Sequence, residues 1–371
     1  AHQGRARGPL FAFILNAVTD DIAKHRAAID ALDEKIVALL NERAAHAVVI
    51  GKLKNGGAYR PEREAQVLRR VAGANRGPLS DEALLRMFTE IVSGCRSLEQ
   101  PLAVAFLGPA GTFSEMALGK QFGSSVAAQP FASIDEVFRA AETRTAQYAV
   151  VPVENSTDGA IGRTLDLLLT TPLRICAEVV LRVQQNLMAK GASIKAIRKV
   201  YSHPQSLAQC HGWLSQHLPG VQRVPLASNA EAARAAAKER SAAAIGPEIA
   251  AERYKLKILA RSIEDDPKNR TRFLVLGSHD AEPSGKDRTS LVMTTHNRPG
   301  SLHDLIASFS TYGVNMTRLE SRPARTGQWE YYFYVDIEGH REDSKVAQAL
   351  AELREKAPFV KIFGSYPAAV L

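Results

Sequence analysis

The sequence predicts a multidomain protein with three successive folds: an all-α N-terminal region, an α/β middle domain and an α+β C-terminal domain. In residues 20–54, apolar side chains recur every three or four positions without a proline, which is typical of a long amphipathic helix. From residue 102 onward, short apolar runs end in polar turns and lead into helical patterns, as in α/β folds. Residues 288–371 follow the order strand, helix, strand, strand, helix, strand, which is that of a ferredoxin-like domain.

Length and composition limit the classes of function. The chain has 371 residues, of which 45% are hydrophobic, so two or three domains can each bury a core. The formal net charge of +8 fits nucleic acid, anionic lipid or anionic metabolites as partners. Because the basic residues are spread along the chain and only 6% of residues are aromatic, we expect small anionic substrates rather than nucleic acid.

The cysteines and the first residues bear on location. Cys95, Cys176 and Cys210 follow no disulfide or zinc-ligand spacing, which favours a reduced, cytoplasmic compartment and no structural metal. Residues 1–19 contain the apolar run LFAFIL, which is too short to span a bilayer. We expect them to form a disordered extension, followed by the first domain at residues 20–100.

Three cations interrupt the apolar stripe of the first helix. Arg26, Arg43 and Lys54 occupy positions where a core helix would carry leucine or valine. Arg43 and Lys54 lie about 16 Å apart along the axis and can converge on one small anion, whereas Arg26 is about 25 Å from Arg43. Arg26 is therefore structural, or it completes a second copy of the site from a partner chain. The alternative is an amphipathic helix whose arginines simply extend to solvent.

Two shorter helices are expected after the first. Pro61 suits a first helical position, and Ser80 suits the N-cap of a helix that ends near Leu98. One very long helix with two shorter ones would leave apolar surface uncovered in a monomer, which again indicates a partner. Pro101 marks the boundary to the middle domain, which is expected at residues 102–280.

Four polar turns hold the chemistry expected of the middle domain. We expect them at strand ends of one sheet, where ligands bind in α/β folds. They are residues 108–114 (GPAGTFS), 153–157 (VENST), 201–205 (YSHPQ) and 269–273 (NRTRF). Individually, each also fits an ordinary turn or a helix N-cap. Thr271 and Arg272 alternate along a strand, so one of them can face the cleft and the other the opposite side.

These segments resemble a known family. GPAGTFSE, VPVENSTDGAIG, YSHPQSLAQC and NRTRF match, in order, the signature segments of prephenate dehydratases. TRLESRP and RPGSL resemble the ACT regulatory domain that binds phenylalanine, and ALDEKIVALLNER, GKLK and RPERE resemble the all-helical chorismate mutase. From about residue 20, the chain therefore resembles the bifunctional chorismate mutase/prephenate dehydratases of phenylalanine biosynthesis. The resemblance implies a two-lobed, periplasmic-binding-protein-like dehydratase domain, an ACT domain at residues 288–371, a homodimer and no cofactor.

The resemblance assigns residues to a mutase site that rearranges the dicarboxylate chorismate into prephenate. Such a site must hold one conformer and stabilise negative charge on the ether oxygen. Arg43, with Arg26 of the partner subunit, would bind the carboxylates, and Lys54 would reach the ether oxygen. Arg63 and Glu64 would complete the wall, with Glu64 on the substrate hydroxyl.

Three positions of the mutase region depart from the enteric pattern of the family. Arg60 stands where an aspartate is often found, Cys95 replaces a serine in the substrate-binding set, and Glu99 replaces a glutamine. A carboxylate at position 99 would repel the developing oxyanion. We therefore hypothesise that Glu99 works in its protonated form, as a catalytic hydrogen-bond donor.

The dehydratase step removes a ring hydroxyl and carbon dioxide together. By resemblance, Thr271 is the expected catalytic residue, where its weakly acidic hydroxyl would donate a hydrogen bond to the departing hydroxyl or relay a proton. Glu154 is the nearest proper acid. The complete predicted substrate-binding set of this domain is Thr112, Glu154, Asn155, Ser156, Ser202, Gln205 and Phe273.

The resemblance also implies feedback inhibition by phenylalanine. The effector would bind between two ACT domains, with its carboxylate on the N–H groups of a helix start. The expected contacts are Pro299, Gly300, Ser301, Leu302, Asn315, Glu320, Ser321, Arg322 and Pro323.

Other interpretations stay open on the sequence alone. A non-catalytic amino-acid-binding regulator could share the α/β and ACT folds, although the intact Thr271 argues against it. A mutase paired with a dehydrogenase would need the GxGxxG motif, which is missing. A dehydratase that is monofunctional or accepts arogenate, with a degenerate mutase region, is a further alternative. Nucleic-acid binding rests on net charge alone.

Overall fold

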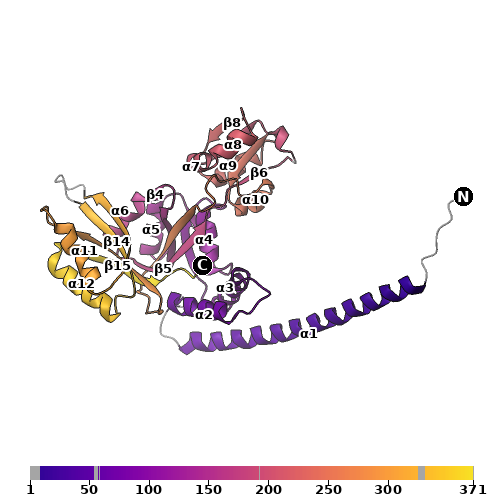
Figure 1. Cartoon of the computed structure of the whole chain (residues 1–371), viewed down its shortest axis with the longest axis horizontal. Coiled ribbons are helices and arrows are strands. Elements are labelled where there is room, and N and C mark those ends of the chain that lie inside the picture. The colour runs from indigo at the N-terminus through magenta and orange to yellow at the C-terminus, as the bar shows by residue number, and fades with distance from the viewer. Residues whose placement is uncertain (1–8, 54–56, 58, 192, 325–330, 371) are drawn as a thin grey trace. The chain divides into compact units, whose positions relative to one another are not determined.

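The computed structural model describes residues 9–53, 57, 59–191, 193–324 and 331–370, with side chains described from Asp21 onward. Contacts divide the chain into two compact units, one comprising residues 1–58 and 98–100 and the other residues 59–97 and 101–371. The N-terminal region contributes three helices (Figure 1), which are α1 (Pro9–Leu53), α2 (Pro61–Ala74) and α3 (Asp81–Ser97).

The first helix is longer than the sequence predicted. α1 begins at Pro9 rather than at Asp20, so the expected disorder is wrong for residues 9–19. Proline suits a first helical turn, and no proline or glycine follows it until Gly51, so nothing in the sequence stops the helix earlier. Residues 1–8 lie outside the described residues.

The three N-terminal helices do not form one compact domain. α2 and α3 belong to the same unit as the middle domain, whereas α1 is grouped with residues 98–100. Tyr59, which precedes α2, is 1% exposed and packs against Phe122 and Tyr148 of the middle domain, with ring centroids 4.7 and 4.9 Å apart. Arg96 of α3 donates to the carbonyl oxygen of Phe122 and pairs with Glu64 of α2. These contacts join α2 and α3 to the middle domain across the boundary expected at residue 100.

The middle domain has two lobes, each built on its own sheet (Figure 1). The first lobe has a six-stranded sheet in the order β2-β1-β3-β11-β5, with β4 paired to β3. Its elements are β1 (Ala103–Leu107), α4 (Phe113–Phe122), β2 (Ala127–Phe131), α5 (Ile134–Glu142), β3 (Tyr148–Asn155), β4 (Gly159–Ala160), α6 (Gly162–Thr170), β5 (Arg174–Arg182) and β11 (Arg270–Gly277).

The second lobe has a five-stranded sheet in the order β10-β6-β9-β7-β8. Its elements are β6 (Asn186–Ala189), η1 (Ile194–Ala196), β7 (Lys199–Ser202), α7 (Pro204–Gln209), α8 (His211–His217), β8 (Gln222–Pro225), α9 (Asn229–Ala236), β9 (Ala242–Gly246), α10 (Glu248–Tyr254) and β10 (Lys257–Ala260). The expectation that the four polar turns share one sheet is wrong, because residues 201–205 follow a strand of this second sheet. The chain enters the lobe after β5 and returns in β11, so the two crossings lie side by side.

The C-terminal domain has the predicted order of strands and helices. Its antiparallel four-stranded sheet runs β13-β14-β12-β15. The elements are β12 (Asp287–Thr294), α11 (Ser301–Thr311), β13 (Met316–Pro323), β14 (Tyr331–Glu338), α12 (Ser344–Lys356) and β15 (Phe359–Pro367). The two helices cover one face of the sheet, where Phe309 and Leu350 are buried.

The other face of the C-terminal sheet packs on the first lobe of the middle domain. Tyr334 and Phe363 of this sheet share a hydrophobic core with Leu165 of α6. Gly364 permits the close approach, because a Cβ atom there would overlap the carbonyl oxygen of Ile175 in β5. The two domains therefore share one core across their interface.

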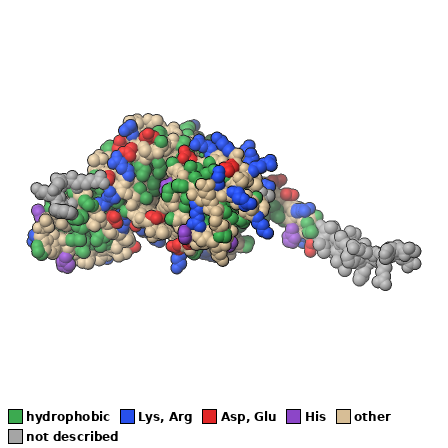
Figure 2. All heavy atoms as spheres, turned by 90° about the horizontal axis from the view of Figure 1, so that it is seen from above, with side chains coloured by type: hydrophobic (Ala, Val, Ile, Leu, Met, Phe, Trp, Pro, Cys, Tyr) green, Lys and Arg blue, Asp and Glu red, His purple; other side chains and the backbone are tan. Residues whose placement is uncertain are grey.

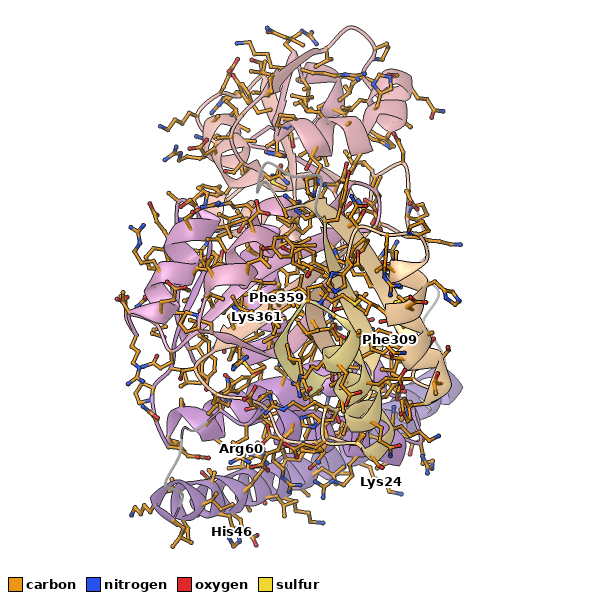
Figure 3. All side chains as sticks on the ribbon, turned by 90° about the vertical axis from the view of Figure 1, so that its left-hand side faces the viewer. Lys24, His46, Arg60, Phe309, Phe359 and Lys361 are labelled. Carbon is orange, nitrogen blue, oxygen red and sulfur yellow. The ribbon has the colours of Figure 1, made fainter. Side chains whose placement is uncertain are left out.

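Lys361 reinforces this contact at the end of α6. Figure 3 shows Lys361 and Phe359 close together, and both belong to β15. The Lys361 ammonium donates to the carbonyl oxygens of Leu168, Leu169 and Thr171 at 2.8 to 3.0 Å. It thus satisfies carbonyls that the end of a helix leaves without intrahelical partners.

Charged side chains cover the surface without forming a single basic block. Figure 2 shows Lys and Arg side chains spread over one face, with Asp and Glu side chains among them. This distribution agrees with the one along the sequence. Within the described ranges, no helix is both long and apolar enough to cross a membrane.

Arg96→Ala is expected to destabilise the unit that joins α2, α3 and the middle domain by about 3–5 kcal/mol, because it removes a buried ion-pair partner. Arg96 and Glu64 are 4% and 14% exposed at their side chains. Chemical denaturation measures the change. The matched control is Arg86→Ala on the same helix, where the Arg86–Glu82 pair is 3.8 Å long and mostly exposed. That variant should lose less than about 0.5 kcal/mol, and equal losses would contradict the anchoring role of Arg96.

Candidate functional site

Thr271 and Asn155 face each other at one edge of the first sheet. They are register partners at the start of β11 and the end of β3. The Asn155 amide donates to the Thr271 hydroxyl oxygen and to the Asn269 side-chain oxygen, both at 2.9 Å. The Asn155 oxygen accepts from the backbone N–H groups of Thr157 and Asp158 at 3.0 and 3.1 Å. Because Asn155 holds Thr271 as an acceptor, the Thr271 proton can be donated to a ligand.

Neighbouring residues fix this pair. Asn269 is 1% exposed, and its carbonyl accepts from Val183 in the first crossing between lobes. The exposed Ser156 accepts from the backbone N–H of Arg270 at 2.9 Å. Asn269 had no predicted role, and its place in the motif NRTRF was the only signal for it.

A buried amide network supports the facing lobe. The Ser202 hydroxyl donates to the Ile245 carbonyl at 2.9 Å and lies 3.1 Å from the Asn229 oxygen. Asn229 also bonds Ser206, and Ser206 accepts from Gln185 in the first crossing. Ser202 is fully buried, so it positions Asn229 and was wrongly expected to contact substrate. No single motif signalled Asn229 or Gln185.

Two sets of contacts bridge the lobes. On one side, Gln205 and Gln209 of α7 donate to Asp158 at 2.6 and 2.9 Å. On the other side, Tyr254 of α10 donates to the Ala110 carbonyl at 3.1 Å. Gln205 therefore joins the two lobes through Asp158, a residue that the sequence analysis did not single out, and its predicted contact with substrate stays a prediction.

The first polar turn meets the second lobe directly. Gly111 has a φ of +97°, and a Cβ atom there would lie 3.1 Å from the Tyr254 ring, so glycine suits this position. Thr112 donates to the Leu107 carbonyl at 3.1 Å and precedes α4. Glu115 in the first turn of α4 pairs with Arg253 of the second lobe.

His203 is a partly buried imidazole at the start of α7. Its Nδ1 accepts from the backbone N–H of Gln205 at 3.3 Å. Burial lowers the pKa of His203 from its ordinary value, although Asp158 acts in the opposite direction. The imidazole therefore stays neutral to a lower pH than a solvent-exposed histidine would.

Two residues expected at the substrate lie elsewhere. Glu154 points to the C-terminal domain, where it lies 3.1 Å from the Arg318 guanidinium. Its neighbour Asn155 points to the cleft, because successive side chains of a strand alternate. Phe273 is 1% exposed and belongs to the hydrophobic core of the first lobe with Phe106 and Val179. Neither Glu154 nor Phe273 lines the cleft with Thr271.

One chain leaves the predicted apolar stripe of α1 uncovered. Ile29, Ile36 and Val37 are 55%, 51% and 58% exposed. Of the predicted cations, Arg26 is exposed and Arg43 is partly exposed, while Lys54 lies outside the described residues.

The remaining predicted mutase residues are spread over both units. Arg63 is exposed, Glu64 pairs with Arg96, and Cys95 is buried. Glu99 lies against the last turns of α1, so close that a Cβ atom on Gly51 would lie 2.9 Å from its Cγ. Glu99 and Gly51 belong to the same compact unit.

A hollow of about 280 Å³ lies at the start of α11 in the C-terminal domain. The Ser301 hydroxyl is buried there and has no hydrogen-bond partner among the described residues. The lining residues are Thr295, His296, Arg298, Ser301, Asp304, Leu305, Ala307 and Lys356.

The predicted effector residues divide into two groups. Ser301 lines the hollow, with the exposed Pro299 and Gly300 just before it and Leu302 just after it in α11. The others lie at or on β13: Asn315, Ser321 and Pro323 are exposed, Glu320 is partly buried, and Arg322 pairs with Asp166 of the middle domain at 3.1 Å. One chain does not bring the two groups together in that hollow. Within the described ranges, no group of three or more His, Cys, Asp or Glu is placed to hold a metal ion.

Family models match three consecutive parts of the chain: chorismate mutase type II at residues 25–100, prephenate dehydratase at 104–281 and the ACT domain at 289–355. The bifunctional chorismate mutase/prephenate dehydratase of Neisseria gonorrhoeae is 51% identical over 94% of this chain and 97% of its own length. This chain belongs to the bifunctional chorismate mutase/prephenate dehydratase family. The middle domain is its dehydratase domain, and the C-terminal domain is its ACT domain.

Solved structures match the dehydratase and ACT domains together. The prephenate dehydratase of Arthrobacter aurescens, solved in complex with L-Phe, is 34% identical, covers 72% of this chain and 90% of its own, and has a TM-score of 0.66. GqqA, titled a quorum-quenching acylase, is 30% identical, covers 72% of this chain and 98% of its own, and also has a TM-score of 0.66. These two domains alone therefore do not fix the reaction, and the relative that includes the mutase region carries the assignment.

Asp158→Ala is expected to raise the dehydratase KM for prephenate by about tenfold, because each lost hydrogen bond across the cleft contributes about 0.5–1.5 kcal/mol. Steady-state kinetics measure this change. The control is Asp135→Ala, which removes an exposed pair with Arg163 within the first lobe. An unchanged KM in the Asp158 variant would show that its bonds to Gln205 and Gln209 do not hold the lobes around substrate.

Proposed function

We propose that this protein converts chorismate to prephenate at its N-terminal helices and prephenate to phenylpyruvate at the dehydratase cleft, under feedback inhibition by phenylalanine. The observation that carries the proposal is the match over 94% of the chain to a relative named for both activities. No reaction step in the proposal requires a cofactor. We place the enzyme in the cytoplasm, because its three cysteines are buried and unpaired, as in a reduced compartment.

In the dehydratase reaction, Thr271 donates a hydrogen bond to the departing ring hydroxyl. Its hydroxyl proton is oriented away from Asn155, which donates to the same oxygen. A threonine is too weak an acid to transfer its proton outright, so it stabilises the leaving hydroxyl or relays a proton. Ser156, Gln205 and Thr112 supply polar groups for the substrate from both lobes. Aromatisation and loss of carbon dioxide drive the step.

In the mutase reaction, cations hold the two carboxylates of chorismate in one conformer. Arg43 acts with Arg26 of the partner subunit, Lys54 reaches the ether oxygen, and Glu99 donates to that oxygen when protonated. Arg63 and Glu64 lie on α2, which packs with the dehydratase domain. The proposed mutase residues therefore come from α1, from α2 and from a second chain.

The exposed face of α1 supports a homodimer. Its apolar side chains are too many to leave in water, and a second α1 running the other way is a complementary cover. The apolar residues of α1 that are at least 45% exposed are Ile22, Ile29, Leu32, Ile36, Val37, Leu39, Val49, Ile50 and Leu53. An antiparallel pairing also places Arg26 of one chain near Arg43 of the other.

Phenylalanine is the proposed effector of the hollow at α11. Arg298 and Asp304 line it and pair with each other at 3.2 Å, and by exchanging this pair they would offer opposite charges to the carboxylate and ammonium of an amino acid. The unpaired Ser301 hydroxyl offers a hydrogen bond. The relative from Arthrobacter aurescens was solved with L-Phe. In the assembly, residues at or on β13 of a partner ACT domain, including Asn315 and Glu320, would close this site.

Incubation with chorismate is expected to yield prephenate and then phenylpyruvate, with less phenylpyruvate when phenylalanine is added. Thr271→Ala should stop the sequence at prephenate while leaving mutase turnover near that of the unaltered enzyme, whereas Thr271→Ser should retain dehydratase turnover. Absorbance assays follow both products. Prephenate accumulation by the unaltered enzyme would support a mutase without a dehydratase, and no turnover of either substrate would support a non-catalytic regulator. A side-by-side assay with arogenate tests the second substrate.

Arg26→Ala and Arg43→Ala are each expected to abolish mutase activity and to leave dehydratase activity intact. If each site combines Arg43 of one chain with Arg26 of the other, a mixed dimer contains one site with both substitutions and one site with neither. After the two inactive proteins are mixed, each mixed dimer should therefore have up to about half of the mutase activity of an unaltered dimer. The control is mixing each variant with itself. No recovery after subunit exchange would show that both arginines act within one chain.

A further inference from the structure

Two successive residues of β11 connect the dehydratase cleft with the ACT domain. Thr271 faces the cleft and its register partner is Asn155. Arg272 faces the ACT sheet, and its register partner Glu154 does the same. Each residue of the Thr271–Asn155 pair is thus adjacent in the chain to a residue that contacts the ACT domain.

Arg272 is held by three acceptors. Its Nε lies 2.7 Å from Glu178 of β5, and its two terminal nitrogens bond Asp336 of β14 and Tyr366 of β15 at 2.5 and 2.7 Å. The side chains of Arg272, Glu178 and Asp336 are 11%, 2% and 5% exposed. Removing one member of such a buried cluster leaves the others desolvated, so the cluster holds its members to one arrangement.

The ladder beside Arg272 is irregular. The register between β11 and β3 shifts between Arg272 and Phe273, and pairing resumes beyond the shift with Arg272 opposite Glu154 and Thr271 opposite Asn155. A bulge of this kind redirects the side chains next to it. Glu178, Asp336 and Tyr366, which bind the Arg272 side chain, therefore help to fix the position of Thr271.

Asp336 and Tyr366 are also linked, through β12, to the hollow at α11. Ser290 of β12 donates to Asp336 and lies within hydrogen-bond distance of Tyr366. β12 continues from Ser290 to Thr294 in register with β14, and its pairing with β15 shifts between Ser290 and Leu291; Thr295 lines the hollow. A ligand that shifts the end of β12 would thus move the two ACT residues that bind Arg272.

We propose that Arg272 is a positioning residue for the dehydratase reaction and that it transmits effector binding in the ACT domain to Thr271. This inference rests on the proposed dehydratase function and its inhibition by phenylalanine. Arg272 does not touch the cleft; it acts through the strand it shares with Thr271. Asp336 and Tyr366 belong to strands of the ACT sheet, so any movement of that sheet moves both residues. Arg272 then either moves with them or loses its buried hydrogen-bond partners.

The test compares Arg272→Lys and Arg272→Met with the unaltered enzyme. Both should lower the dehydratase kcat by about 10- to 100-fold, since small misplacements of a reacting group have effects of this size. The KM for prephenate should change by less than about twofold, because the cleft contacts stay in place. Arg272→Lys should recover part of the kcat lost in Arg272→Met. Unchanged mutase turnover in the same preparations shows that the chains are folded.

Coupling is measured with Asp336→Asn, whose amide oxygen can still accept from Arg272, and inhibition is expressed relative to the uninhibited rate of the same variant. Calorimetry should show phenylalanine binding within about threefold of the unaltered enzyme, while maximal inhibition falls by at least half. The matched control is Arg174→Lys at the same domain interface, where Arg174 donates to the Ile362 carbonyl at 2.9 Å but adjoins no cleft residue. It should keep both kcat and inhibition.

Two outcomes separate this inference from the proposed function. If the unaltered enzyme does not convert prephenate, the function itself is wrong. If it converts prephenate but the Arg272 variants keep kcat and the Asp336 variant keeps full inhibition, the inference is overturned. Loss of inhibition in Arg174→Lys to the same degree would also overturn it, because any damage to the interface would then suffice.

Discussion

The buried charge cluster of Arg272, Glu178 and Asp336 is the constraint on which the arrangement of the catalytic and regulatory domains depends. Burial disfavours the charge of Asp336, but Arg272 and Ser290 outweigh this effect and hold the pKa of Asp336 below its ordinary value. The cluster is stable only when both domains contribute their members. Since Arg272 directly follows Thr271, the contact that joins the domains also constrains the position of Thr271 at the start of β11.

The N-terminal region obeys a different constraint. α1 carries more apolar surface than one chain covers, which is the ground for the proposed pairing with a second α1. α2 and α3 instead belong to the same unit as the dehydratase domain, where Arg96 bonds the Phe122 carbonyl and Tyr59 joins the core. The mutase region is therefore divided between a helix whose apolar side chains are exposed in one chain and a pair of helices that belong to the same compact unit as the dehydratase domain.

Local patterns predicted much of the candidate site. Alternation along β11 correctly separated Thr271 from Arg272, and the motif residues Asn155 and Gln205 bond Thr271 and Asp158. The same patterns could not show that Glu154 pairs with the ACT domain, because either face of β3 was available to it. They also could not show that the Ser202 hydroxyl is consumed by buried partners, since Asn229 and Ile245 are distant in sequence.

The sequence by itself determined the kinds of elements, the three folds and the chemical groups at the cleft, because periodicity and signature motifs involve residues a few positions apart. The tertiary structure alone decided which lobe carries each turn, where α2 and α3 pack and what Arg272 binds. These depend on contacts between distant segments, such as Arg272 with Asp336, 64 residues further along the chain. Such pairings follow from the path of the whole chain, and local spacing does not encode them.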